Sequence, residues 1–474
     1  MAAAALYGRA RAMNGLRVKA GLRASALGLL LGLAACASDT PPPEPVQPVP
    51  QLPPEVRVGL LLPLSGPAEA LGRDMLDAAE MALFDVGDND LMLLPRDTAG
   101  TPEGARRAAQ QVIDEGAEVI LGPLFGQAVA AVSPIAAAAD RRVIAFSNDA
   151  SVAGDGTFLL GFRPEEQVER VISYALASGA VMRAEPAPPG PAIDQEAAPS
   201  ETPPPERLYP SQPSFDLRPP RIAGLAPDDP YGAATLEALR EAVAAGGGML
   251  GDTLVYPANA ADPSPVVRQI AAYDQRAAAL EAERARLAQS EDPEAERALQ
   301  TLETRDTVGG PPFDAILLAD GGDRLRSVAS LLTFFDVDPA TTRFLGTMRW
   351  QSDPRVLAES ALQSGWFAAP APDDLAAFQR RFRDIFGRSP DPLAALAYDA
   401  TALAVVAARD LSDRSFARET LINAQGFTGA SGLFRLRPDG LADHGLAVLE
   451  VSGGATRTLD PAPTRFVDEL AALW

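Results

Sequence analysis

The feature that most constrains the fold is a regular alternation of short apolar runs with longer amphipathic stretches. The apolar runs predict strands at residues 56–62, 91–95, 119–121, 143–146, 221–225, 254–256, 313–318 and 343–346. The stretches between them predict helices, and Thr101 stands where it would cap one of them. Repeated strand–helix–strand units favour parallel sheets with helices on both faces, because such crossovers are right-handed. About 420 residues from position 55 onward suffice for two α/β lobes.

Two stretches interrupt this alternation. Residues 184–220 hold many prolines and few large apolar side chains, which predicts an irregular surface loop. Residues 271–310 are rich in Ala, Glu, Arg and Leu, which predicts a solvated helix or helical hairpin. That insertion is either an exposed segment without a role or an arm on which a partner docks. The predicted division is a first lobe at 55–170, a second lobe at 171–370, a return to the first lobe at 371–430, and C-terminal strands with a tail at 431–474.

The amino-terminal residues have the pattern of a secretory leader, residues 1–35. Basic residues precede the apolar run 24–34, and Cys36, the single cysteine, follows that run closely. Residues 33–36, Leu-Ala-Ala-Cys, resemble the bacterial lipobox, which implies cleavage before Cys36 and acylation of this residue. The alternative is an ordinary signal peptide with a cysteine at its cleavage site. Residues 36–54 then form a lipidated start and a proline-rich, extended tether.

Charge and composition exclude several classes of function. The sequence has 41 basic and 63 acidic residues, and loss of residues 1–35 removes five of the basic ones, which leaves a net charge of −27. Because such a chain repels phosphate backbones, we expect no nucleic-acid binding. Lys19 is the single lysine and is lost with residues 1–35, so no lysine nucleophile is expected. His444 is the single histidine, so a multi-histidine metal site is not expected either. We expect no cofactor, no metal and no enzymatic activity, and we expect His444 on a surface turn.

Four motifs resemble type I periplasmic binding proteins of the leucine-binding kind. They are residues 58–66, 119–123, 228–232 and 391–399, in the order that this family has. The resemblance covers most of residues 55–455. It implies two lobes, each a mostly parallel sheet flanked by helices, with several crossings between the lobes. It also implies that a small molecule binds between the lobes, where strands end.

The positions that would bind a free amino acid depart from that family's pattern. Gly126 and Gln127 stand where hydroxyl residues are usual, and Asp149 stands where a threonine would bind the ligand carboxylate. Met348 lies near the place of the acid that binds the ammonium group. An ionised Asp149 would repel a ligand carboxylate by about 1 to 4 kcal/mol at contact distance. We therefore expect no simple amino-acid pocket.

The chain is also similar to lipoproteins that activate penicillin-binding proteins. Those lipoproteins carry the same two-lobe module behind a lipobox and act by protein contact. The lipobox, residues 122–124, the altered amino-acid positions and the helical insertion fit this resemblance. Enterobacterial members have a helical-repeat domain before the module, whereas here only the tether precedes it. The resemblance implies a class A penicillin-binding protein as partner. Because Ala37 and Ser38, which directly follow Cys36, are not the aspartate that retains such lipoproteins in the inner membrane, the resemblance also implies attachment to the outer membrane, facing the periplasm.

Polar and aromatic residues that follow predicted strands are the candidates for a ligand site. They are Ser65, Gly66, Gln127, Ser147, Asn148, Asp149, Tyr231, Asp320, Gly321, Trp350 and Gln351. The alternative role for a polar residue at such a place is a helix cap or turn, which is the role we expect for Asp97 and Asp228. Trp350 is either a platform for a sugar or peptide or part of the packing at the hinge.

Three functions remain open at this point. The leading hypothesis is a lipid-anchored regulator of peptidoglycan synthesis in the cell envelope that activates a class A penicillin-binding protein by contact. The alternative is the solute-binding receptor of an ABC importer, with a peptide, amide, amino-acid derivative or sugar-like ligand. The third is a glycan hydrolase with paired acids, although no spacing in the sequence singles out a pair.

Overall fold

The computed structural model describes residues 56–87, 91–179, 181, 218–259, 262–409 and 416–466. Cys36, the tether and most of the proline-rich stretch 184–220 lie outside these residues. All described residues belong to one compact unit, which comprises residues 53–474.

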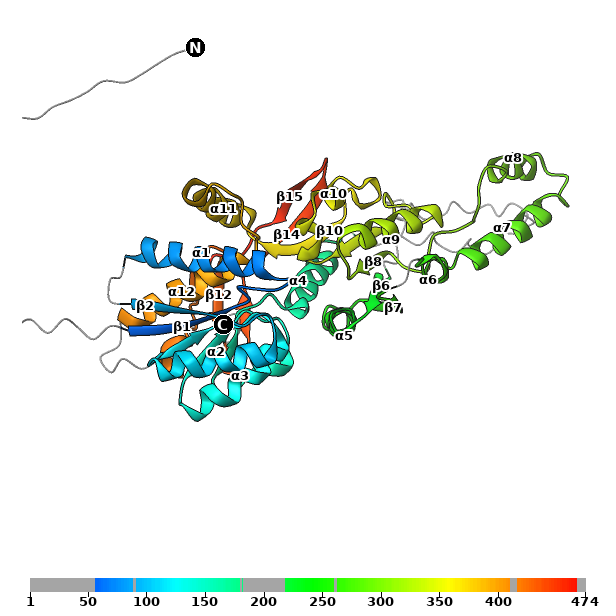
Figure 1. Ribbon diagram of the computed structural model, residues 1–474. Helices are drawn as coiled ribbons and strands as arrows, with labels where there is room; N and C mark the ends of the chain where they lie inside the picture. Colours follow the sequence, from blue (N-terminus) through cyan, green and yellow to red (C-terminus); the bar gives the residue numbers. More distant parts are fainter. Residues whose placement is uncertain are drawn as a thin grey trace, which may run out of the picture. The chain divides into compact units, whose positions relative to one another are not determined.

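The first sheet has five parallel strands in the order β2-β1-β3-β4-β5. The strands are β1 (Val56–Leu62), β2 (Leu91–Asp97), β3 (Val119–Leu121), β4 (Arg142–Ala145) and β5 (Thr157–Leu159). Helices α2 (Pro102–Asp114) and α3 (Gly126–Ala138) cover one face, and α1 (Glu69–Val86) and α12 (Ala394–Arg409) cover the other (Figure 1). Every residue of β1 except Arg57 is buried, as a strand with neighbours on both sides and helices on both faces requires.

The second sheet has seven strands in the order β15-β14-β10-β9-β8-β6-β7. Its parallel strands are β6 (Arg221–Asp228), β7 (Met249–Pro257), β8 (Ala315–Leu318), β9 (Arg343–Gly346) and β10 (Trp366–Pro370). Two antiparallel strands, β14 (Leu446–Ser452) and β15 (Ala455–Asp460), complete one edge. Helices α4 (Pro164–Ala177) and α5 (Pro230–Ala245) pack on one face, and α6 (Ser264–Ile270) and α9 (Gly322–Phe334) pack on the other.

The chain passes between the two sheets more than once. From β5 it runs through α4 into β6, and from β10 it returns through α11 (Pro372–Phe386) to α12, which packs on α1. It then forms α13 (Arg418–Leu421) and a small antiparallel sheet of β11 (Phe427–Gly429), β12 (Gly432–Leu436) and β13 (Ala442–His444) before it enters β14. One buried cluster joins Val58 and Ile144 of the first sheet to Ile222 and Leu345 of the second. The predicted α/β fold with two lobes and several crossings is confirmed.

Local signals in the sequence explain several element boundaries. The Thr101 hydroxyl accepts a hydrogen bond from the Gly104 N–H at 3.0 Å and caps α2, as predicted. Asp97 holds a turn, also as predicted, because it accepts a hydrogen bond from the Leu64 N–H at 2.9 Å. The expected cap at Asp228 is displaced by one residue: Asp229 caps α5 by accepting from the Gly232 N–H at 2.8 Å. Asp228 is still the last residue of β6.

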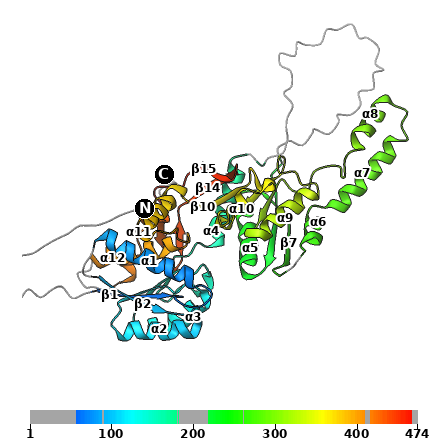
Figure 2. The ribbon, with the colours of Figure 1, turned by 45° about the horizontal axis from the view of Figure 1, so that its top comes forward.

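The insertion is a helical hairpin of α7 (Tyr273–Leu287) and α8 (Pro293–Leu302), which confirms the predicted helices. Figure 2 shows the pair extending beyond α6 and α9. The Arg284 guanidinium joins the two helices by donating to the carbonyls of Leu302 at 2.8 Å and Arg305 at 3.0 Å. Short helical turns complete the second lobe: η2 (Met348–Ser352), α10 (Pro354–Leu357) and η3 (Ser360–Leu362). Another, η1 (Ala150–Val152), follows β4.

His444 does not lie on a surface turn, so that expectation was wrong. It is the last residue of β13, and its side chain is 1% exposed. Its Nδ1 lies 3.0 Å from a carboxylate oxygen of Glu166 in the first turn of α4, and its ring lies 4.4 Å from that of Phe162. Packing of α4 on β13 buries the imidazole, and the sequence around position 444 does not reveal this contact.

Candidate functional site

The candidate residues lie beyond the carboxyl ends of strands in both sheets. On the first sheet, Ser65 and Gly66 follow β1, Gln127 lies in the first turn of α3, and Ser147, Asn148 and Asp149 follow β4. On the second sheet, Tyr231 follows β6, Asp320 and Gly321 follow β8, and Trp350 and Gln351 follow β9. We call these two groups the first edge and the second edge. Within the described ranges, no hydrogen bond joins one edge to the other.

Ser65 at the first edge is engaged by its own loop. Its hydroxyl donates to Asp97 at 2.6 Å, and the same carboxylate accepts from the backbone N–H groups of Leu64 at 2.9 Å and Ala99 at 2.7 Å. Burial raises the pKa of Asp97, but the hydrogen bonds from Ser65, Ala99 and Leu64 outweigh it, so the net pKa is lowered. Asp97 therefore fixes the turn that carries Ser65 and Gly66, and the Ser65 proton is already donated.

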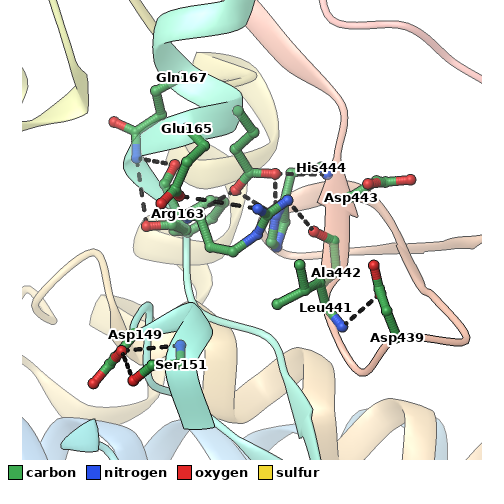
Figure 3. A network of polar contacts seen from close by, with 12 residues as sticks. Asp149, Ser151, Arg163, Glu165, Gln167, Asp439, Leu441, Ala442, Asp443 and His444 are labelled. Carbon is green, nitrogen blue, oxygen red and sulfur yellow. Dashed lines mark hydrogen bonds and ion pairs between the residues drawn. The ribbon is translucent and has the colours of Figure 1, made fainter. Parts of the chain in front are cut away.

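Asp149 is likewise engaged by neighbouring residues at the first edge, through one of its two carboxylate oxygens. Its carboxylate accepts from the backbone N–H of Ser151 at 3.1 Å and from its hydroxyl at 2.6 Å (Figure 3), while its own N–H donates to the Ser147 hydroxyl at 3.1 Å. A side chain at Gly126, the first residue of α3, would meet a carboxylate oxygen of Asp149 at 2.6 Å. The glycine at position 126 therefore leaves room for Asp149 at the amino end of α3, where a helix favours an anion. Gln127 and Asn148 are exposed.

The second edge carries a guanidinium group stacked on an aromatic ring. The Arg349 Cζ atom lies 3.4 Å from the centroid of the Tyr231 ring, which is cation–π geometry. The Tyr231 hydroxyl donates to the buried Thr347 hydroxyl at 2.9 Å, which fixes the ring. Burial raises the pKa of Tyr231, against the opposite effect of Arg349. In the part of the chain that the structure describes, Arg349 makes no ion pair and its guanidinium donates no hydrogen bond.

Asp320, by contrast, is neutralised inside the second lobe. This buried carboxylate accepts from the Tyr256 hydroxyl, from Arg324 Nε at 2.5 Å and from the Gly321 N–H at 2.8 Å. Burial raises the pKa of the Tyr256 hydroxyl, and the hydrogen bond to Asp320 raises it further. The hydrogen bond to Asp320 raises the pKa of Arg324, which keeps its charge. Asp320 is therefore the centre of an internal network and is not a free acid for a ligand ammonium group.

Trp350 is a core residue, so of its two alternatives the packing role holds. Its side chain is fully buried, and its Nε1–H donates to the Leu318 carbonyl at 3.3 Å. A side chain at Gly346 would lie 2.0 Å from its ring, so the indole packs directly on the end of β9. Gln351 is half-buried, and its amide nitrogen has no hydrogen-bond partner among the described residues. Gly321 lies close to Arg349, because a side chain there would meet the Arg349 carbonyl at 3.1 Å.

Sequence reasoning missed the groups that organise the second edge, Arg349, Thr347 and Gln167. We expected Met348 near the position where the family has the acid that binds a ligand's ammonium group. In the structure Met348 has a backbone role instead, because its N–H donates to the Gln167 side-chain oxygen at 2.9 Å. Gln167 in turn donates to the Arg163 carbonyl at 3.0 Å, a contact visible in Figure 3. A basic residue three positions after a predicted strand was the available signal for Arg349. Nothing in the sequence points to the contact of Gln167 with residue 348.

Most charged side chains at the two edges are engaged by neighbouring residues. Among the described residues, no group of three His, Cys, Asp or Glu side chains could hold a metal ion. Asp97 and Asp149 at the first edge and Asp320 at the second accept hydrogen bonds from neighbouring residues, whereas the half-buried Arg349 guanidinium donates none within the described ranges. In the described ranges, no helix is long and apolar enough to cross a membrane.

Comparison with known proteins places this geometry in context. A family described as "Periplasmic binding protein" matches residues 55–456. A relative from Rickettsia prowazekii (strain Madrid E), described as an uncharacterized protein, is 27% identical over 120 residues. That match covers 25% of this chain and 32% of the relative, so the chain spans about a third of the relative's length.

Solved structures show the same fold at low sequence identity. A leucine-binding protein from Thermotoga maritima is 16% identical, covers 86% of this chain and 98% of its own length, and has a TM-score of 0.53. A putative branched-chain amino acid ABC transporter from Rhodospirillum rubrum is 15% identical, covers 85% and 100%, and has a TM-score of 0.61. A solute-binding protein from Rhodopseudomonas palustris BisB5 in complex with 3,4-dihydroxybenzoic acid is 16% identical, covers 88% and 99%, and has a TM-score of 0.56.

Proposed function

We propose that this chain, which belongs to the periplasmic binding protein family, is a periplasmic receptor whose ligand presents an anionic group to Arg349. The family implies a periplasmic location. The observation that carries the proposal is the guanidinium stacked on Tyr231, which has no ion pair within the described residues. Such a group is oriented in advance and offers paired N–H donors in the geometry that a carboxylate accepts. The receptor would serve an ABC importer, as the descriptions of its solved neighbours indicate for those proteins.

The ligand that fits best is a carboxylate without a neighbouring ammonium group. An α-amino acid needs an acid for its ammonium group, but Asp320 is paired with Arg324, and Asp149 accepts from Ser151. The Rhodopseudomonas neighbour holds 3,4-dihydroxybenzoic acid, a carboxylic acid of this kind. This class of ligand also agrees with the expectation that the chain has no simple amino-acid pocket.

Thermal unfolding with a panel of ligands tests this proposal. At 100 times its dissociation constant, a bound ligand adds about 2.7 kcal/mol to the free energy of unfolding. We expect 3,4-dihydroxybenzoate or a related carboxylate to stabilise the protein and leucine to have no effect. Arg349→Gln should weaken that binding at least tenfold, because it removes a charged donor. Arg355→Gln is the matched control, since Arg355 pairs with Asp353 by an ion pair of 2.8 Å. Equal binding by both variants would contradict the proposal.

A second candidate function is favoured by the α7–α8 hairpin. We infer from it that the chain is a lipid-anchored regulator at the outer membrane that activates a class A penicillin-binding protein by contact. The hairpin is anchored at its root, because the buried Arg276 donates to the carbonyls of Gly309 at 3.0 Å and Asp336 at 2.9 Å. An insertion with a fixed base and an exposed, charged outer part attracts a partner surface of complementary charge.

Reconstituted glycan polymerisation distinguishes this second function from the first. The acylated chain should raise the rate of a class A penicillin-binding protein, and replacement of residues 279–303 by a short Gly-Ser linker should abolish the increase. Carboxylate binding at Arg349 should be unaffected by that replacement. Labelling with a radioactive fatty acid, lost in Cys36→Ala, tests the proposed anchor. No rate increase by the acylated wild-type chain would rule out the second function.

A further inference from the structure

An aromatic ring is exposed among the loops of the first edge. Phe125 lies four residues beyond β3 and directly precedes α3, and its side chain is 41% exposed. In the described ranges, the other exposed large apolar side chains lie within helices or strands. We propose that Phe125 forms the apolar side of the ligand site, and that the ligand is a carboxylate carried on a planar aromatic ring. This inference rests on the proposed receptor function, in which Arg349 binds the carboxylate.

Loops that follow three neighbouring strands surround the Phe125 ring. A side chain at Gly100, in the loop after β2, would meet the ring at 3.3 Å and Pro63, in the turn after β1, at 3.9 Å. Strands β2, β1 and β3 are adjacent in the first sheet, so the ring lies beyond their carboxyl ends. The absence of a side chain at Gly100 lets the ring pack on the loop backbone. The ring is therefore placed before a ligand arrives, which lowers the entropic cost of binding.

Several polar groups beside Phe125 are engaged by their own loops. The Ser65 hydroxyl donates to Asp97 at 2.6 Å, and Asp149 accepts from the Ser151 hydroxyl at 2.6 Å. Phe125 itself is the residue at the start of α3, where its side chain makes no capping hydrogen bond. The first edge therefore contributes an apolar surface through Phe125, whereas the second edge contributes a charged donor.

Both edges adjoin the stretch of chain that leads from β5 into α4. A side chain at Gly161, just after β5, would meet the Ser147 carbonyl of the first edge at 2.4 Å. Gln167, in the first turns of α4, accepts from the N–H of Met348, the residue before Arg349, at 2.9 Å. Residues 161–167 thus contact both edges, and one ligand beside this stretch can contact the two edges together.

The two side chains favour a ligand with two unlike ends. The Arg349 guanidinium offers N–H donors in the geometry that a carboxylate accepts. The Phe125 ring offers a flat apolar surface, on which another ring stacks with a gain beyond that of simple burial. Small-molecule sites commonly combine such an apolar lining with a few placed polar groups. An aliphatic acid would bind to Arg349 equally well but would lack the stacking contact.

Calorimetric titration of the full chain with benzoate and with butanoate tests this inference. The two probes carry the same carboxylate and differ in their apolar part. We expect the wild-type chain to bind benzoate about tenfold more tightly than butanoate, because the ring stacks on Phe125. Phe125→Ala should remove most of this preference, and Phe125→Tyr, which keeps the ring, should retain it. Phe84→Ala is the matched control, since it removes an exposed ring from α1 and should change either affinity less than about twofold.

The preference of the wild-type chain is measured without any variant, so it tests the inference even if Phe125→Ala does not fold. Equal affinity for benzoate and butanoate would overturn the inference, as would equal benzoate binding by Phe125→Ala and Phe84→Ala. Arg349→Gln separates the inference from the proposed function, because it should weaken the binding of both probes. If it does so while Phe125→Ala leaves benzoate binding unchanged, the inference fails and the receptor function stands. If neither probe binds the wild-type chain, both fail.

Discussion

The first and second edges differ in what their charged side chains do. At the first edge, Asp97 and Asp149 accept hydrogen bonds from their own loops and fix the turns after β1 and β4. At the second edge, Asp320 is neutralised internally, whereas Arg349 lies on the Tyr231 ring without an ion pair in the described ranges. The acids at both edges are therefore structural, and the cation of the second edge is the group left for a ligand.

This difference shows that position after a strand does not by itself define a binding group. Ser65 and Asp149 occupy places where the family resemblance implies ligand contacts, yet neighbouring residues already satisfy them. Helix α4 connects the second edge with β13, because Gln167 contacts Met348 while the adjacent Glu166 contacts His444. Selectivity for the charge of a ligand is therefore expected to come from the second lobe.

The largest effect is expected when the support of the second edge is removed. Trp350→Ala should lower the free energy of unfolding by about 3 to 5 kcal/mol, because it leaves a large cavity beneath β9. Urea unfolding measures the change, and Gln351→Ala is the neighbouring control, expected within about 0.5 kcal/mol of wild type. A loss below about 1 kcal/mol for Trp350→Ala would mean that the indole does not support this edge.

The next effect concerns the acid that organises the first edge. Asp97→Ala should cost about 2 kcal/mol at pH 7, because it removes an ionised acceptor of several hydrogen bonds. The pKa of Asp97 is lowered in the folded protein, so its stabilising contribution is present above its ordinary pKa and is lost as the pH falls through the lowered value. The difference between variant and wild type in urea unfolding should therefore shrink as the pH falls below the ordinary range of an aspartate. A difference independent of pH would contradict this role.

A smaller effect tests the contact of Asp149 with α3. Gly126→Ala should cost about 1 kcal/mol, because the added methyl group would meet the Asp149 carboxylate at 2.6 Å and displace it. In the double variant with Asp149→Gly, which also removes the Asp149 Cβ that the new methyl group would meet at 2.9 Å, the cost of the Gly126 change should largely disappear. A double-mutant cycle by thermal unfolding provides the measurement, and strict additivity of the two changes would argue against the contact.

The smallest effect on stability is expected at the proposed binding group itself. Arg349→Gln removes a cation–π contact and should change the free energy of unfolding by less than about 1 kcal/mol. Carboxylate binding should nevertheless be lost, whereas Asp149→Asn should preserve it. If Asp149→Asn abolished binding and Arg349→Gln did not, the charged group that binds the ligand would lie at the first edge and not at the second.

Much of the fold could be predicted because it depends on local pattern. The apolar runs of β1, β3 and β8 are buried strands, and Thr101 caps α2, since periodicity and capping are properties of neighbouring residues. Sequence reasoning failed where distant residues meet. His444 is buried by Glu166, which is 278 residues away, and Tyr231 bonds to Thr347 across 116 residues.

The sequence by itself determined the alternation of strands and helices, the acidic net charge and the positions of loops at strand ends. These follow from side-chain periodicity and composition, which each segment carries alone. Only the tertiary structure decided which loop residues are engaged: Asp149 accepts from Ser151, Trp350 lies in the core, and the half-buried Arg349 guanidinium lies on the face of Tyr231 without an ion pair in the described ranges. The physical reason is that a polar group is available for binding only when packing has not already supplied its partner.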